Sequence, residues 1–333
     1  MPSSSYNPIF IVGPHRAGST LWHNLIAMCP GVLRLTDPRF IGRPRQKDFR
    51  FFLQTQVRGL ATDQDVDTMV DLCFSKKPLP GLEGAFWRFE GIDAADDAQL
   101  KKQIARRLKG SDRSVGAIAK AIFEELTRFS GCDRYCVKFP VDVMHTSVLL
   151  EWFPGCRIVH ITRDPRALAM SKTNDPSGTA TKIIEHPLLA WFIRKASIWF
   201  TVFQYRAAAK LHIRLKDLEN YRLFRYEDLL ANPEETLREL CVFISADFTE
   251  DMLTPQKGRH EHQPSSLTGR RQKAFDTEAA TRWRTMISPL DYLLISYFTN
   301  GSMRKLGYNP KTHPIFQKGK SQLPSVPTQQ VIH

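Results

Sequence analysis

The sequence predicts an α/β fold in which a central parallel sheet is flanked by helices, giving three layers. Short apolar runs rich in β-branched residues alternate with longer segments of helical periodicity, which is typical of parallel sheets. The chain also opens with a strand, a glycine-containing loop and a helix in direct succession. Its 333 residues, 42% of them hydrophobic, are enough to bury a large core. We expect one domain over residues 1–310 and a loosely ordered polar tail over 311–333.

Glycine and proline mark the boundaries of the first elements. Residues 9–12 are continuously apolar and predict a buried strand, which the loop 13–20 follows. Apolar residues then recur at helical spacing from Leu21, until Pro30 and Gly31 end the helix. The apolar run directly after Gly31 predicts a second strand.

The rest of the chain continues the alternation of strands and helices. Residues 36–130 are less regular and predict an insertion region with several helices, of which 112–128 is the clearest. The later elements that we expect are strands at 135–139, 157–162 and 221–226, and helices at 143–152, 165–172 and 187–211, the last of them long and amphipathic. A further helix begins after Asn232, which we expect to cap it, with Pro233 and two glutamates in its first turn.

The composition gives a net charge of +13 at pH 7. Together with the hydrophobic content, this excludes a disordered chain, a collagen-like repeat and a small disulfide scaffold. A positive excess suits nucleic acid, an anionic membrane surface or a phosphorylated small molecule. Composition does not choose among these three partners.

The sequence shows no sign of export or of a membrane span. The N-terminus lacks the basic and apolar segments of a signal peptide. The most apolar run, between Lys195 and Arg206, is about half as long as a bilayer-spanning helix. The six cysteines form neither a disulfide framework nor a metal-ligand set, although Cys132 and Cys136 are close in sequence. We therefore expect a cytoplasmic protein with reduced thiols and no metal site, and we assign it no oligomeric state.

The first chemical motif is Gly13-x4-Gly18-Ser19-Thr20, which has the spacing of a phosphate-binding loop. Glycines let backbone N–H groups crowd around an anion, and the helix that follows presents its positive end. Ser19 replaces the lysine that nucleotide triphosphatases use, whereas Arg16 places a cation inside the loop. The motif thus predicts an anion site in a P-loop-like fold that is not built for ordinary ATP hydrolysis. The alternative interpretation is a plain joint between a strand and a helix.

The second motif follows a predicted strand and reads Arg163-Asp164-Pro165-Arg166, with Ser171 two helical turns after Arg163. Pro165 suits a first helical turn, and the spacing puts Arg163 and Ser171 near the same face. Ligands collect at the C-terminal ends of strands in open α/β sheets, so both side chains could hold one phosphate. The alternative is an Arg–Asp pair on the surface and a serine on a helix face.

Together the two motifs resemble those of sulfotransferases that use 3′-phosphoadenosine 5′-phosphosulfate (PAPS). That family carries Lys/Arg-Ser-Gly-Thr-Thr after its first strand, where this chain has Arg16-Ala17-Gly18-Ser19-Thr20. It also carries Arg-(Asp/Asn)-Pro-(Arg/Lys)-x4-Ser, which the second motif matches in register. Two further stretches agree, Arg225-Tyr226-Glu227-Asp228-Leu229 with Asn232-Pro233-Glu234, and Arg282-Trp283-Arg284. The resemblance runs from about Pro8 to Pro310.

The resemblance implies a set of residues that bind PAPS. Those at the 5′-phosphosulfate would be Arg16, Ala17, Gly18, Ser19 and Thr20. Arg163 and Ser171 would hold the 3′-phosphate, and Tyr226 belongs to the third matching stretch. A basic loop that closes over the cofactor in the family resembles Lys257-Gly258-Arg259. In cytosolic members a tryptophan that stacks on adenine follows the first motif, whereas here Leu21 stands at that position and Trp22 comes next.

The resemblance also implies roles in sulfuryl transfer. Negative charge builds on the leaving phosphate oxygen, and Arg16 is the natural group to stabilise it because arginine does not easily give up its proton. The stretch Val137-Lys138-Phe139-Pro140 resembles the Lys-(Ser/Thr)-Pro form of glycan and bacterial sulfotransferases, in which the lysine assists at the sulfuryl group. Lys138 would take that role here.

The acceptor must lose a proton, so a general base is needed. Our first candidate is Asp37, which stands where the glycan-type branch often places a carboxylate. His145 and then His15 are the next candidates. Asp37 could instead be a turn residue before a proline, and His145 a histidine on a helix face.

The implied activity is sulfuryl transfer to a hydroxyl, or less favourably an amine, of a carbohydrate, glycolipid or small molecule. Residues 36–130 and 173–185 would shape the acceptor pocket. One rival is a small-molecule kinase on the same loop, which the missing lysine disfavours. The other is a binder of nucleic acid or of a membrane surface that uses the basic and aromatic stretch 39–50. We do not expect nucleic acid as a partner, while peripheral contact with a membrane is compatible with the enzyme.

Overall fold

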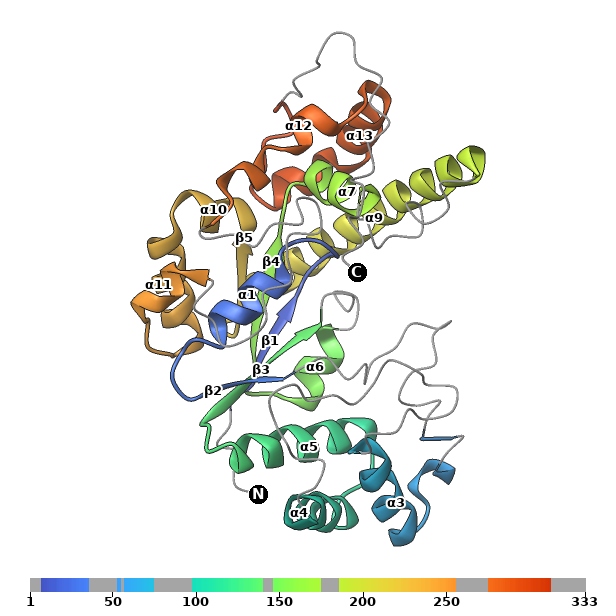
Figure 1. Ribbon diagram of the computed structural model, residues 1–333, viewed down its shortest axis with the longest axis vertical. Helices are drawn as coiled ribbons and strands as arrows, with labels where there is room; N and C mark the ends of the chain where they lie inside the picture. Colours follow the sequence, from blue (N-terminus) through green and yellow to red (C-terminus); the bar gives the residue numbers. More distant parts are fainter. Residues whose placement is uncertain are drawn as a thin grey trace, which may run out of the picture.

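A parallel sheet of five strands runs through the part of the chain that the structure describes (Figure 1). Its strands are β1 (Ile9–Val12), β2 (Val32–Leu35), β3 (Arg134–Phe139), β4 (Arg157–Thr162) and β5 (Tyr221–Arg225), in the order β2-β3-β1-β4-β5. The central strand is β1, and Val12 at its end pairs with Phe139 of β3 and with His160 of β4. The predicted parallel sheet is thus confirmed, and it brings the ends of three strands together beside the first loop.

The structure is a computed structural model that describes residues 7–35, 53–54, 57–74, 98–139, 146–174, 186–255 and 275–312. Several predicted site residues lie outside these ranges, namely Asp37, His145, Lys257, Gly258 and Arg259. The basic stretch 39–50 and residues 313–333 of the expected tail also lie outside them.

Helices cover both faces of the sheet, which confirms the three layers (Figure 1). On one side lie α3 (Asp63–Cys73), α4 (Ala98–Lys109), α5 (Val115–Phe129) and α6 (Thr146–Trp152), with the 3-10 turn Arg58–Leu60 before them. On the other side lie α1 (Ser19–Ile26), α10 (Tyr226–Ala231) and α11 (Pro233–Ile244), followed by the 3-10 turn Glu250–Leu253. Beyond the end of β4 lie α7 (Pro165–Thr173), the 3-10 turn Thr277–Ala280, α12 (Trp283–Met286) and α13 (Pro289–Lys305). The long helix α9 (Pro187–Leu215) packs against α7 and α13 and reaches the sheet with its C-terminal half.

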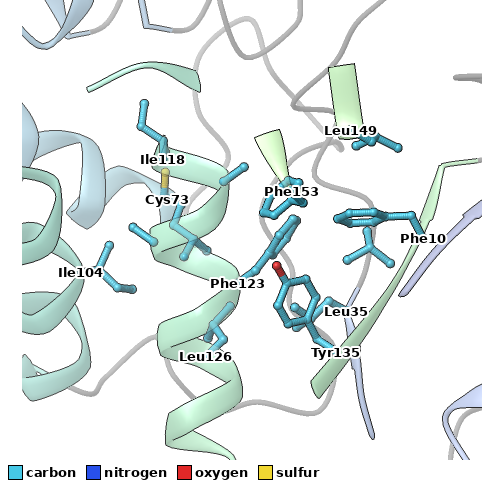
Figure 2. Close-up of a cluster of buried hydrophobic side chains, with 14 of the residues drawn as sticks. Phe10, Leu35, Cys73, Ile104, Ile118, Phe123, Leu126, Tyr135, Leu149 and Phe153 are labelled. Carbon is cyan, nitrogen blue, oxygen red and sulfur yellow. The ribbon is translucent and has the colours of Figure 1, made fainter. Parts of the chain in front are cut away.

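The apolar run of β1 is buried on both faces of the sheet. Phe10 and Val12 enter the core under α3 to α6, whereas Ile9 and Ile11 enter the core beneath α1 and α11. Successive side chains of a strand point to opposite faces, so a strand with a helix layer on each side must be apolar throughout. Figure 2 shows the first core, in which Phe10 lies beside Phe153, and Phe123 beside Tyr135, with ring centroids 5.0 and 5.3 Å apart.

Two helix predictions need correction. Asn232 precedes α11 but makes no side-chain capping bond, so Pro233 and the two glutamates of the first turn mark this helix start without a side-chain cap. The helix predicted at 187–211 extends to Leu215, and its exposed side is apolar rather than polar over the first half. None of the helices in the described ranges is long and apolar enough to cross a bilayer.

Candidate active site

The predicted site residues gather at the C-terminal ends of the strands. The loop that holds Arg16 follows β1, Lys138 is the penultimate residue of β3, Arg163 follows β4, and Tyr226 follows β5. Ligands bind at this edge of open α/β sheets because the loops there are free to carry functional side chains. Four of the parallel strands therefore bring together residues that are far apart in the sequence.

Gly13 and Gly18 are required by the geometry of the first loop. A Cβ atom on Gly13 would collide with the carbonyl oxygen of Ile161 in β4, so only glycine lets β1 turn away so close to its neighbour. Gly18 has a φ of +91°, and a Cβ there would lie 2.5 Å from the ring of Tyr226. Arg16 is also left-handed, with a φ of +71°, which is uncommon for a residue with a side chain. The loop is therefore folded tightly between β4 and Tyr226.

The loop leads directly into the positive end of α1. Gly18 is the N-cap residue, it supplies no side-chain cap, and the first turn contains no acidic residue. The first N–H groups of a helix have no partner within the helix, and the helix dipole adds a partial positive charge there. Ser19 is buried and Thr20 exposed at this end. The arrangement suits an anion held by backbone N–H groups.

The two sequence motifs meet in the structure. The Nε of Arg16 donates a hydrogen bond to the hydroxyl of Ser171 at 3.2 Å. The Nη1 of Arg163 donates to the carbonyl oxygen of Arg16 at 3.3 Å. Ser171 and Arg163 thus each contact Arg16, and their joint binding of one phosphate stays a prediction. Arg16 and Arg163 place two guanidinium groups at one end of the sheet.

The side chain of Arg163 is buried and held from several sides. Its Nη2 donates to the carbonyl oxygen of Ala279 at 2.6 Å, and its guanidinium lies 4.5 Å from the ring centre of Tyr226. Burial raises the pKa of Tyr226, and the charge of Arg163 opposes that shift. Among the described residues, the buried Nε of Arg163 has no hydrogen-bond partner. A buried cation with a spare donor is the kind of group that a phosphate would satisfy.

Lys138 reaches the start of α1 from the neighbouring strand. Its Nζ donates a hydrogen bond to the Oγ1 of Thr20 at 3.1 Å. This contact brings the predicted catalytic lysine to the same helix end as Arg16. Lys138 therefore lies at the positive end of α1, and Arg163 contacts Arg16 in the loop before it, a setting that favours a multiply charged anion.

The second arginine of the second motif has a structural role that the sequence did not reveal. Arg166 is fully buried, and its guanidinium makes two hydrogen bonds of 2.8 and 2.6 Å to the carboxylate of Asp164. It also donates to the carbonyl oxygen of Thr312 at 2.7 Å and lies 4.4 Å from the ring centre of Trp283. The interpretation as an Arg–Asp surface pair is wrong, because Arg163 and Asp164 are both buried and Asp164 pairs with Arg166.

Glu227 fixes the turn between β4 and α7 from the side of β5. Its carboxylate accepts a hydrogen bond from the backbone N–H of Asp164 at 3.0 Å and another from the hydroxyl of Tyr308 at 2.7 Å. Burial is the main cause that raises the pKa of Glu227, and these two hydrogen bonds oppose the shift. The only sequence signal for Glu227 was its place in the stretch that resembles the family.

Trp22 is not available to stack on a nucleotide. Its side chain is completely buried and packs against Phe224 with ring centroids 5.3 Å apart. Leu21, at the position of the family's tryptophan, is half-buried against the same core. The base candidates Asp37 and His145 and the basic loop 257–259 stay predictions. The described part of the chain contains no cluster of three or more side chains suited to a metal ion, and a reaction without metal also stays a prediction.

Comparisons with known proteins agree with this geometry. The model of the sulfotransferase family matches residues 8–250, which include both motifs. Carbohydrate sulfotransferase 5 of Mus musculus is 25% identical over 170 residues, which cover 46% of this chain and 41% of that protein. Carbohydrate sulfotransferase 6 of Homo sapiens is 26% identical over 174 residues, covering 46% and 42%. The chain thus matches less than half the length of these relatives.

Solved structures show the same fold. The sulfotransferase domain from the curacin biosynthetic pathway superposes with a TM-score of 0.57 at 17% identity, over 91% of this chain and 98% of that domain. The sulfotransferase domain of an olefin synthase from Synechococcus PCC 7002 gives 0.51 at 17% identity, over 93% and 99%. At this identity the likeness concerns the fold alone. Because the family model matches most of its length, the chain belongs to the sulfotransferase family.

Proposed function

We propose that the protein transfers a sulfuryl group from PAPS to a hydroxyl group of a carbohydrate, a glycolipid or a small molecule. The observation that carries the proposal is the contact of Arg16 with both halves of the second motif. Arg16 donates to Ser171, and Arg163 donates to the carbonyl oxygen of Arg16. Arg16 and Ser171 are 155 residues apart in the sequence, and their contact thus joins the two motifs into one cationic site.

The described residues fit a nucleotide that carries phosphate at two positions. The loop 13–18 and the uncapped start of α1 offer backbone N–H groups, as the 5′-phosphosulfate requires. Arg163 offers a buried Nε without a described partner, which suits the 3′-phosphate. When bound, PAPS would supply the sulfuryl group and a phosphate leaving group.

Arg16 and Lys138 would serve the transfer itself. Arg16 would stabilise the charge that develops on the leaving phosphate oxygen, because a guanidinium held in place by hydrogen bonds needs little reorganisation during the reaction. Lys138, held by Thr20 at the start of α1, would neutralise the sulfuryl oxygens. Asp37 remains our first candidate for the base that takes the acceptor's proton.

Two details of the proposal rest on other observations. The curated relatives are carbohydrate sulfotransferases, which favours a carbohydrate hydroxyl as the acceptor. All six cysteines are described and are free thiols, and this supports a reducing compartment such as the cytoplasm.

The test is transfer of a radiolabelled sulfuryl group from PAPS into candidate carbohydrates and cell extracts, followed by mass spectrometry of the product. We expect transfer by the wild type, none by Arg16→Ala, and partial activity in Arg16→Lys, because the family motif accepts either cation. Near-normal turnover in Asp37→Asn would remove Asp37 as the base. Phosphate transfer from ATP in place of sulfuryl transfer would contradict the proposal.

A further inference from the structure

One side of α9 presents a continuous exposed stripe along the helix. Its members recur at intervals of three, four or seven residues and therefore share one face. They are Leu188, Phe192, Trp199, Phe203, Arg206, Lys210 and Arg214. Leu188 is 79% exposed and Phe192 is 61% exposed. The stripe is divided along its length, since it is apolar up to Phe203 and basic from Arg206 onward.

Helix α13 widens the apolar part of the stripe. It packs along α9, where the rings of Phe298 and Trp199 meet edge to face at 4.8 Å. Leu290, Leu293 and Tyr297 are exposed on α13, Tyr297 by 78%. Scattered apolar residues are normal on a protein surface, whereas a contiguous apolar area on two adjacent helices marks a contact site. We refer to the stripe of α9 and these residues of α13 as the aromatic–basic surface.

The N-terminal half of α9 projects away from the sheet (Figure 1). Farther along the helix, a groove of about 580 Å³ lies where the apolar half meets the basic half. Trp199 and Phe203 line its apolar part, and Arg206, Lys210 and Arg214 line its basic part. The groove therefore combines apolar walls with positive charge.

The charge of the aromatic–basic surface has one sign. Helix α9 contains no aspartate or glutamate. The one acidic residue of α13 is Asp291, which is buried and paired with Lys195. A surface of this kind complements a partner that has both apolar groups and negatively charged groups. A second copy of the chain would bring the same positive charges with it, so it fits this surface less well.

We propose that the aromatic–basic surface docks the protein on an anionic lipid bilayer. Tryptophan, phenylalanine and leucine side chains enter the boundary between headgroups and acyl chains, while arginine and lysine contact the anionic headgroups. The surface lies outside the sulfotransferase site, so failure of either proposal leaves the other standing.

The test is co-sedimentation of the full chain with vesicles of phosphatidylcholine alone and with about one third phosphatidylglycerol. We expect binding to the anionic vesicles, and at least about tenfold weaker binding in Arg206→Glu/Lys210→Glu, because each cation near such a surface contributes to attraction. Leu188→Ser/Phe192→Ser changes only highly exposed side chains and should weaken binding to a similar extent.

The matched control is Lys102→Glu/Arg106→Glu on α4. These two exposed residues have the same spacing and undergo the same charge change, but α4 lies at the other end of the molecule (Figure 1). The control should bind anionic vesicles as the wild type does, and circular dichroism should show that every variant is still folded. Equal loss in the control, or no binding by the wild type, overturns the proposal. So does a wild-type dimer in sedimentation velocity that Leu188→Ser/Phe192→Ser dissociates.

Discussion

Arg16 has a backbone conformation that costs about 1–2 kcal/mol for a residue with a side chain. Its φ of +71° turns the chain so that its side chain reaches Ser171 while its carbonyl oxygen accepts from Arg163. Unfavourable backbone conformations persist where the surroundings hold them, and they concentrate at functional sites. At the scale of single residues, the loop therefore holds Arg16 where it contacts both Ser171 and Arg163.

Gly18→Ala tests the packing of that loop against Tyr226. The new Cβ would lie 2.5 Å from the Tyr226 ring, at a φ where side chains are already strained. We expect the variant to lose at least about tenfold in affinity for 3′-phosphoadenosine 5′-phosphate, measured by calorimetry, because an anion site depends on the position of the loop N–H groups. Gly131→Ala is the control, since Gly131 also has a positive φ but meets nothing within 4 Å. It should cost about 1 kcal/mol of stability and leave the affinity unchanged.

His160 makes stability depend on pH. Burial, and next the charge of His212, lower the pKa of His160 from 6.5 to about 3. Below pH 6.5 the His160 side chain therefore binds a proton in the unfolded chain but not in the folded chain. Stability is lost as the pH falls toward 3. We expect the unfolding free energy to drop by about 1.4 kcal/mol per pH unit from this residue. Urea unfolding at pH 6.5, 5.5 and 5.0 should show a flatter dependence in His160→Gln, and parallel dependences would count against this account.

At the scale of elements, continuous apolar runs predicted the strands and periodic patterns predicted the helices. All five described strands match predicted ones to within a residue. These predictions work because a parallel strand under two helix layers needs apolar residues throughout, and β1 shows this directly. The exposed stripe of α9 does not follow this rule, because its apolar side chains are not buried in a core.

Arg166 shows what local patterns cannot reveal. It lies in a motif that suggested anion binding, yet it joins α7 to a segment more than 140 residues later. Its partners at Asn309, Pro310 and Thr312 become neighbours only after the chain has folded back from α13. The spacing of residues in the sequence does not show that the segment after α13 folds back against Arg166. For the neighbouring Arg163, phosphate binding was predicted from its place at the strand end and from the family resemblance, and it stays a prediction.

Arg166→Ala should destabilise the protein by about 3 kcal/mol, because it leaves the buried carboxylate of Asp164 without its partner. Arg166→Lys should recover little of this loss, since lysine cannot make the paired contact with the carboxylate. Urea unfolding measures both. Arg238→Ala is the control, because Arg238 pairs with Glu234 on an exposed helix face, and removing such a pair should cost less than about 0.5 kcal/mol. Equal destabilisation in Arg166→Ala and Arg238→Ala would show that the buried contacts of Arg166 contribute no more to stability than an exposed ion pair.

At the scale of the whole molecule, the C-terminal part of the chain forms hydrogen bonds with residues at the C-terminal ends of the strands, where the candidate site lies. Ala279 accepts from Arg163, Gly307 accepts from Arg225, and Tyr308 donates to Glu227. These residues lie beyond the region that the family model matches. The second motif and the stretch that begins at Arg225 are therefore held by a segment whose sequence gave little indication of its place.

Part of the net charge of +13 belongs to the two places for which we propose anionic partners. Arg16, Lys138 and Arg163 would form the proposed site for an anionic nucleotide at the strand ends. Arg206, Lys210 and Arg214 form the basic half of a separate surface on α9. Composition alone indicated an anionic partner, and the two proposals place basic residues at two separate parts of the fold.

The central claim is that the two motifs form one site for a nucleotide with a 3′-phosphate. It is tested most directly by calorimetric titration of wild type and Arg163→Ala with 3′-phosphoadenosine 5′-phosphate and with AMP. We expect the wild type to prefer the 3′-phosphorylated nucleotide by about tenfold to a hundredfold, since a hydrogen bond to a charged group contributes about 1.5–3 kcal/mol. Arg163→Ala should bind the two nucleotides with nearly equal affinity. A preference that survives unchanged in Arg163→Ala, or a wild type that does not distinguish the nucleotides, would contradict the claim.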